Sequence, residues 1–222
     1  MAKKRISDVL IEVLANAGIE RIYGITGDSL NSVNDSLRRN GKIAFEHVRH
    51  EETAAFAAGA EAALTHKLTV CAGSSGPGNL HLINGLFDCH RNRVPVLAIA
   101  SHIPQSEVGL NYFQETHPEN LFKECSCFCE LVSNPKQMPE ILFRAMNAAV
   151  GNQDVAVIVL PGDVAVMETE IDELPVWHHP RLPHIVPQRE DIEEMAAHLE
   201  KGERITLFCG AGCEGAHDEV VE

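Results

Sequence analysis

The chain of 222 residues is 45% hydrophobic and 23% charged, which is typical of a soluble globular protein. Its 18 Lys and Arg residues against 32 Asp and Glu residues give a net charge of −14, which argues against binding to nucleic acid or to anionic membranes. No apolar run approaches the roughly 20 residues that span a bilayer. The N-terminal segment MAKKRISDVL has no signal-peptide core, so we expect a cytoplasmic protein.

Apolar residues recur at helical spacing and in short continuous runs, and the two patterns alternate along the chain. Helices are predicted over residues 6–17, 29–39, 51–64, 79–90 and 135–151. Strands are predicted over residues 21–26, 42–48, 68–72, 94–100, 126–132 and 155–160. The runs VPVLAIA and VAVIVL are apolar throughout, as strands buried on both faces are. This alternation predicts an α/β fold with a doubly wound, mostly parallel six-stranded sheet.

The pattern changes after residue 165. Residues 166–188 contain the proline-rich run WHHPRLPHIVP and read as a linker. Residues 189–222 then predict a helix (189–200), a strand (204–209) and a GxGxxG loop, so they are expected to begin a second, Rossmann-like α/β domain. Within that loop Gly210 and Gly212 are candidate dinucleotide contacts. The chain stops inside this unit, so we expect a fragment of a longer polypeptide.

The stretch VRHEETAAFAAGAEAAL, residues 48–64, is the strongest functional candidate. It places Glu51 directly after a predicted strand, at the start of a helix made largely of small residues. Parallel sheets bind their ligands at the carboxyl ends of their strands, so Glu51 is expected in a ligand site. The alternative is that acidic residues only favour the positive end of a helix.

Clusters of cysteine and histidine give weaker signals. The run CSCFC and the pair Cys209 and Cys213 lack the spacing of a zinc site, so reduced and buried thiols are expected, with metal binding by the CxCxC run as the alternative. His178 and His179 have no partner cluster in the sequence, so a solvated tract is favoured over a metal site.

Three segments carry a resemblance to a known family: VRHEETAAFAAGAEA, GSSGPGNLHLINGLFDCHRNRVPVLAIA and NYFQETHPENLFKECS. They resemble the pyrimidine-binding domain of thiamine diphosphate-dependent decarboxylases and oxidases, over roughly residues 5–165. The motifs FQETHP and DCHRN are most similar to those of pyruvate oxidases of the pyruvate:quinone oxidoreductase type. The resemblance therefore implies a thiamine diphosphate pyrimidine-binding domain at residues 1–165 and the start of an FAD-binding domain at residues 189–222.

The resemblance also implies roles for individual residues. Glu51 matches the glutamate that hydrogen-bonds N1′ of the cofactor's aminopyrimidine, so that the cofactor can deprotonate its own C2. Phe113 and Gln114 match residues near the substrate, and His90 is included with them, although capping of a helix end is the favoured reading of His90. The remaining residues on the pyrimidine side of the cofactor are Asp28, Ser74, Gly76, Pro77, Gly78 and Asn79.

The glycine-rich loop at residues 73–79 has two readings. Physical chemistry alone suggests phosphate binding at the start of a helix. The resemblance instead places this loop beside the pyrimidine, because the family binds the diphosphate and Mg²⁺ through a GDG…NN motif in another domain, and this chain lacks that motif. No metal ligand is therefore expected in this fragment.

For the full-length protein, the resemblance implies decarboxylation of pyruvate to acetate and CO₂, with electrons passing through FAD to a quinone. A homodimer or homotetramer through this domain is expected, with membrane contact at the inner face of the cell membrane only through regions outside this sequence. The fragment alone should be inactive. Two alternatives stay open: an acetolactate synthase-like carboligase of the same superfamily, and a noncatalytic α/β module that pairs with a partner chain.

Overall fold

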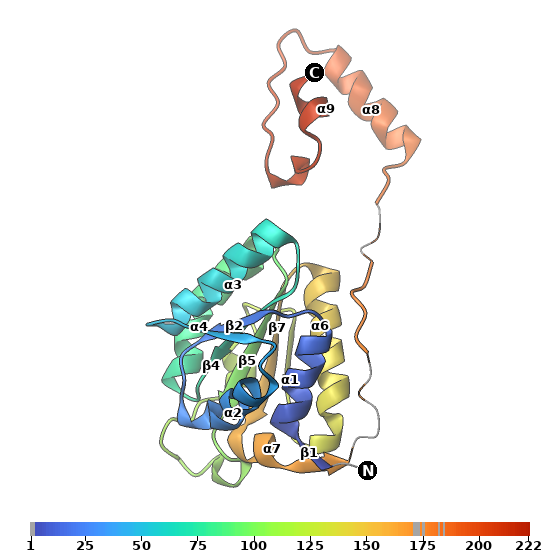
Figure 1. Ribbon diagram of the computed structural model, residues 1–222. Coiled ribbons are helices and arrows are strands. Elements are labelled where there is room, and N and C mark those ends of the chain that lie inside the picture. The colour runs from blue at the N-terminus through green and yellow to red at the C-terminus, as the bar shows by residue number, and fades with distance from the viewer. Residues whose placement is uncertain (1–2, 171–173, 175, 182, 184) are drawn as a thin grey trace. The chain divides into compact units, whose positions relative to one another are not determined.

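A six-stranded sheet forms the centre of the first part of the chain. The computed structural model describes residues 3–170, 174, 176–181, 183 and 185–222 (Figure 1). They group into two units, Met1–Leu182 and Pro183–Glu222. The sheet of the first unit consists of β2 (Arg21–Gly24), β3 (Ala44–His47), β4 (Thr69–Gly73), β5 (Val96–His102), β6 (Phe128–Leu131) and β7 (Val155–Pro161). Their order is β3-β2-β4-β5-β7-β6, and every neighbouring pair is parallel, which confirms the predicted fold class.

Helices cover both faces of this sheet, and the alternation of side chains along each strand fills two separate cores. Leu97 and Ile99 of β5 belong to one core, whereas Val96 and Ala98 belong to the other. The helices are α1 (Ile6–Asn16), α2 (Asn31–Asn40), α3 (Glu51–Thr65), α4 (Pro77–Arg91), α5 (Pro118–Leu121), α6 (Met138–Asn152) and α7 (Gly162–Val166). Helices α1, α2 and α6 pack on one face and α3 and α4 on the other (Figure 1). Strands buried on both faces explain the unbroken apolar runs.

Helices α3 and α4 pack closely because small residues line their contact. A Cβ atom at Gly85 of α4 would lie 2.5 Å from the Cβ of Ala55 and 2.8 Å from the carbonyl oxygen of Glu52, both in α3. At Gly59 of α3 it would lie 2.6 Å from the sulfur of Cys89. The small residues of α3 therefore set the distance between the two helices, and with it the distance between the side chains at their N-termini.

Part of the predicted linker is regular structure. Helix α7 ends at Val166, the first residue of the predicted linker, and Glu168–Glu170 form β8, which pairs antiparallel with β1 (Lys3–Arg5). Trp177 is buried, and its indole N–H donates to the side-chain oxygen of Asn147 at 2.9 Å. The expectation of irregular structure was wrong for Glu168–Glu170, because pairing with the distant N-terminal strand cannot be recognised in the local sequence. Residues 171–173, 175, 182 and 184 of the predicted linker lie outside the described residues.

The second unit contains α8 (Arg189–Glu200), the 3₁₀ turn Ala211–Cys213 and α9 (His217–Val221). The helix predicted over residues 189–200 is confirmed. The strand predicted over residues 204–209 was wrong: these residues are irregular, and Phe208 is fully exposed. A strand needs a neighbour for its backbone hydrogen bonds, and no neighbouring strand lies among the described residues of this unit. Among the described residues, no helix combines the length and apolar character needed to cross a bilayer.

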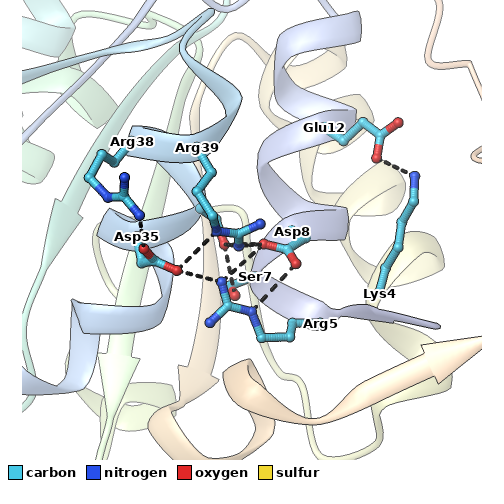
Figure 2. A network of polar contacts seen from close by, with 9 residues as sticks. Lys4, Arg5, Ser7, Asp8, Glu12, Asp35, Arg38 and Arg39 are labelled. Carbon is cyan, nitrogen blue, oxygen red and sulfur yellow. Dashed lines mark hydrogen bonds and ion pairs between the residues drawn. The ribbon is translucent and has the colours of Figure 1, made fainter. Parts of the chain in front are cut away.

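An ion-pair network joins α1 to α2 (Figure 2). Arg5, at the start of α1, donates to the carboxylate of Asp35 in α2 at 2.6 Å, and Arg39 of α2 donates to Asp8 of α1. Arg5 holds the pKa of Asp35 well below its usual range, with further hydrogen bonds from Arg38 and Arg39. The network therefore favours the ionised carboxylates in the folded chain.

We predict that this network makes the stability of the fold depend on pH. A carboxyl group whose pKa is lowered by folding stabilises the fold above its unfolded pKa, near ~4, and loses that contribution as the pH falls. Asp35→Asn should therefore lower the melting temperature at pH 7. Calorimetric scans between about pH 7 and pH 2 should show the difference from the unmodified chain shrinking with acid. A difference that stays constant over this range would contradict the prediction.

Candidate functional site

The carboxyl ends of the parallel strands bring the loops after β2, β3, β4 and β5 to one edge of the sheet. Asp28 follows β2, Glu51 follows β3, residues 74–79 follow β4, and Phe113 and Gln114 lie in the long segment after β5. The direction of strand order reverses here, because β3 lies on one side of β2 and β4 lies on the other. Such a reversal of strand order is where open α/β sheets bind their ligands.

Glu51 is the buried acid at this edge. It is the first residue of α3 and is 7% exposed. Its Oε2 atom lies 3.0 Å from Nδ1 of His81 in α4. Its Oε1 atom would lie 3.2 Å from a Cβ atom at Gly78, so this oxygen faces the glycine-rich loop, where glycine leaves room. The neighbouring Glu52 instead accepts a hydrogen bond from Asn84 at 2.5 Å and is more exposed.

Two histidines flank Glu51, and sequence reasoning missed His81. The rings of His50 and His81 stack with centroids 4.3 Å apart and an interplanar angle of 25°. The donor atoms of His50, Glu51 and His81 lie within 4.8 Å of one another, a set of types that zinc can bind. The nitrogen lone pairs of two stacked rings lie in nearly parallel planes, however, and Nδ1 of His50 already accepts the backbone N–H of Glu52. We therefore assign the trio no metal.

Hydrogen bonds join the loops after β2, β4 and β5. The hydroxyl oxygens of Ser29 and Ser74 are 2.9 Å apart, and the backbone N–H of Ser75 donates to the Ser29 hydroxyl at 3.0 Å. The Ser75 hydroxyl donates to the side-chain oxygen of Gln114 at 3.3 Å. These bonds fix the glycine-rich loop against Gln114, so the two predicted segments lie side by side.

Gly76 makes the approach to Gln114 possible. It has a φ of +67°, and a Cβ atom there would lie 2.7 Å from the Cβ of Gln114. Pro77 follows as the first residue of α4, where its missing N–H costs nothing. The backbone of Gln114 itself has a φ of +67°, a strained value for a residue with a side chain.

The remaining predicted residues at this edge differ in exposure. Phe113 is 79% exposed and Asp28 is also exposed, with its carboxylate accepting from the backbone N–H of Ser29 at 2.8 Å. Asn79 is fully buried, and its amide donates to the carbonyl oxygen of Ser101 at 2.7 Å. The Asn79 amide N–H therefore ties α4 to β5, whereas its Oδ1 atom has no hydrogen-bond partner among the described residues.

His102, at the end of β5, is a further buried polar residue at this edge. Burial lowers its pKa, so the neutral imidazole is favoured. Its Nδ1 atom has no hydrogen-bond partner among the described residues. A buried polar atom of this kind is uncommon and marks a place where a ligand or water can complete the bonding.

His90 is not part of this cluster. It lies near the C-terminal end of α4, where its Nδ1 atom is 2.8 Å from the carboxylate of Asp154, just before β7. The rise of an α-helix separates it by about 18 Å from the Gly78 end of α4. The structure therefore does not place His90 with Glu51, and its contact with Asp154 agrees with a structural role.

Gly210 and Gly212 lie in the second unit, on either side of Ala211, and are exposed. A Cβ atom at either position would meet no atom within 4 Å. All seven cysteines are free thiols. The expectation that they are buried holds for Cys71, Cys89 and Cys125, but it was wrong for Cys127 and Cys209, which are exposed.

Comparison with known proteins shows the family of this chain. Residues 4–121 match the model of the thiamine pyrophosphate enzyme, N-terminal TPP binding domain family, and the chain belongs to this family. It is 58% identical, over its whole length, to an uncharacterized 42.6 kDa protein in the isoamylase 3′ region of Pseudomonas amyloderamosa, of which it covers 56%.

Two named enzymes are more distant relatives. The chain is 32% identical to pyruvate oxidase of Lactiplantibacillus plantarum, with 95% of this chain and 36% of the enzyme aligned. It is 28% identical to acetolactate synthase 2, chloroplastic, of Zea mays, with 96% of this chain and 34% of the enzyme aligned. The chain thus spans about a third to a little over half of the length of these relatives.

Proposed function

We propose that the first unit binds the aminopyrimidine of thiamine diphosphate at the carboxyl edge of its sheet, with Glu51 as the acid that contacts N1′. The observation that carries this proposal is the placement of Glu51: it is buried, and its Oε1 atom faces the glycine-rich loop at Gly78. A buried carboxyl group beside a backbone that carries no side chain suits a flat heterocycle that offers a ring nitrogen. When bound, the cofactor supplies a carbon acid whose conjugate base adds to a keto acid.

The residues of the chain would divide the work at this site. Glu51 can share a proton at Oε1 with a ring nitrogen, which is general acid–base chemistry. Gly76 allows the backbone to lie close to Gln114, and Gly78 leaves space beside Oε1 of Glu51. Gln114 and Phe113 lie at the opening of the site, where an amide donor and an aromatic ring can orient a keto acid and exclude water. Mg²⁺ and the diphosphate would be held by residues outside this sequence.

For the full-length protein we propose oxidative decarboxylation of pyruvate to acetate and CO₂, with FAD and then a quinone as electron acceptors. The similarity of FQETHP and DCHRN to pyruvate oxidases supports this, as does the pyruvate oxidase among the relatives. Gly210 and Gly212 are the proposed FAD contacts. Glu51 is proposed to work at an interface of a homodimer or homotetramer in the cytoplasm, with membrane contact only through other regions.

The relatedness to acetolactate synthases favours a second candidate, in which the full-length protein joins two keto acids. One experiment separates the two. Full-length protein loaded with thiamine diphosphate, Mg²⁺ and FAD is given pyruvate and an artificial electron acceptor, and acetate and acetolactate are quantified. Acetate formed in step with reduced acceptor supports the oxidase, and acetolactate without reduction supports the carboligase. If neither product forms and calorimetry detects no binding of thiamine diphosphate, the result supports a noncatalytic module.

A further inference from the structure

His81 makes a contact that the proposed function leaves unexplained. It lies in the second turn of α4, three residues after Gly78, and its Nδ1 atom is 3.0 Å from Oε2 of Glu51. With the shared proton of Glu51 at Oε1 or on the ring nitrogen, Oε2 can only accept a hydrogen bond, so the Nδ1 atom carries the proton in this contact. The imidazole N–H therefore donates to one of the two oxygens of the proposed catalytic acid.

The ring of His81 is itself held in place. It stacks on His50, whose own ring is fixed because its Nδ1 atom accepts the backbone N–H of Glu52 at 3.3 Å, capping α3. His50, which caps α3, thus provides the ring on which His81 of α4 stacks. Both contacts restrict rotation of the His81 side chain, although 44% of that side chain is exposed.

Fixing one oxygen of Glu51 determines the direction of the other. With Oε2 bonded to His81, Oε1 faces Gly78 and the glycine-rich loop. A group that is already oriented loses less rotational freedom when a ligand binds. Both the ligand and the transition state are therefore bound more tightly. We infer that His81 is a positioning residue, which holds Glu51 with Oε1 directed at the pyrimidine. This inference rests on the proposed role of Glu51.

The test uses full-length protein and three variants. His81→Leu removes the donor, His81→Asn keeps an N–H near the position of Nδ1, and Asn84→Ala removes the comparable bond from α4 to Glu52, one turn further along. The dissociation constant of thiamine diphosphate is measured by calorimetry with excess Mg²⁺, and kcat and KM for pyruvate at saturating cofactor. We expect His81→Leu to weaken binding by about tenfold and to lower kcat with little change in KM, as loss of a hydrogen bond to a charged group does.

His81→Asn and Asn84→Ala should each stay within about threefold of the unmodified protein, the spread of a near-neutral polar change. The same His81→Leu substitution made in a Glu51→Gln background should add little, because coupled residues lose their effects together. Three results would overturn the inference. They are a further tenfold loss of affinity when His81→Leu is added to Glu51→Gln, unchanged affinity and kcat in His81→Leu alone, and an equal loss of affinity and kcat in Asn84→Ala. If Glu51→Gln itself leaves binding and turnover unchanged, it is the proposed function that fails instead.

Discussion

Replacing Glu51 by Gln is expected to reduce turnover of the full-length enzyme by about 10²–10⁴-fold, the usual loss when a general acid–base group is removed. Gln keeps the size of the side chain and can still contact His81, so the fold should persist. What it loses is the ability to share a proton at Oε1, the oxygen that faces Gly78. The cofactor should then exchange its C2 proton slowly, which NMR of the bound cofactor in D₂O can measure directly.

Glu52→Gln is the matched control. Glu52 is the next residue in the chain and also accepts a hydrogen bond from α4, but from Asn84 rather than His81. Its carboxylate should take no part in proton exchange, so this variant is expected to keep nearly full activity. Turnover of Glu51→Gln within threefold of the unmodified enzyme would contradict the proposed site, as would an equal loss in Glu52→Gln.

The second large effect is expected from Gly85→Ala in α4. A methyl group there would lie 2.5 Å from the Cβ of Ala55 and 2.8 Å from the backbone oxygen of Glu52, so α3 and α4 must separate. Overpacking of this kind typically costs about 1–3 kcal/mol of unfolding free energy. Urea denaturation monitored by circular dichroism measures it. Because Glu51 and His81 lie on these two helices, the variant should also weaken binding of thiamine diphosphate.

Gly151→Ala controls for the change of residue type. Gly151 also lies in a helix, α6, but a Cβ atom there would meet nothing within 4 Å. Removing a flexible glycine from a helix should then stabilise the fold by about 0.5–1 kcal/mol. Opposite signs for the two substitutions are the expected result. Destabilisation by both, to a similar extent, would mean that close packing of α3 and α4 is not the cause.

The fold could be predicted from the sequence largely because its central strands are buried on both faces. Runs such as VPVLAIA and VAVIVL leave few alternatives to a parallel sheet covered by helices, and these runs form β5 and β7. The pairing of Lys3–Arg5 with Glu168–Glu170 could not be predicted, since three polar residues give no periodicity and the partner is far along the chain. The strand predicted over residues 204–209 does not form, because a run of apolar residues alone does not supply a neighbouring strand.

The candidate site could be predicted where its signal was local. Glu51 stood out because a carboxylate followed a strand and preceded a helix of small residues, and the loop at residues 73–79 stood out by its glycines. His81 is 30 residues from Glu51, so no spacing connects the two; its position three residues after Gly78, on the same face of α4, was the available clue. His90 was grouped with the substrate residues because a motif read as a string does not reveal that a long helix carries its two ends far apart.

The proposed site draws on two kinds of structural element. Glu51 is attached to a helix that the core holds rigidly, whereas Phe113 and Gln114 belong to the mostly irregular segment between β5 and α5. Substitutions, insertions or deletions in that segment leave the sheet register unaltered, since loops tolerate change better than packed elements. Under the proposed function, changes in that segment would alter the accepted keto acid and leave the proton-sharing helix unchanged.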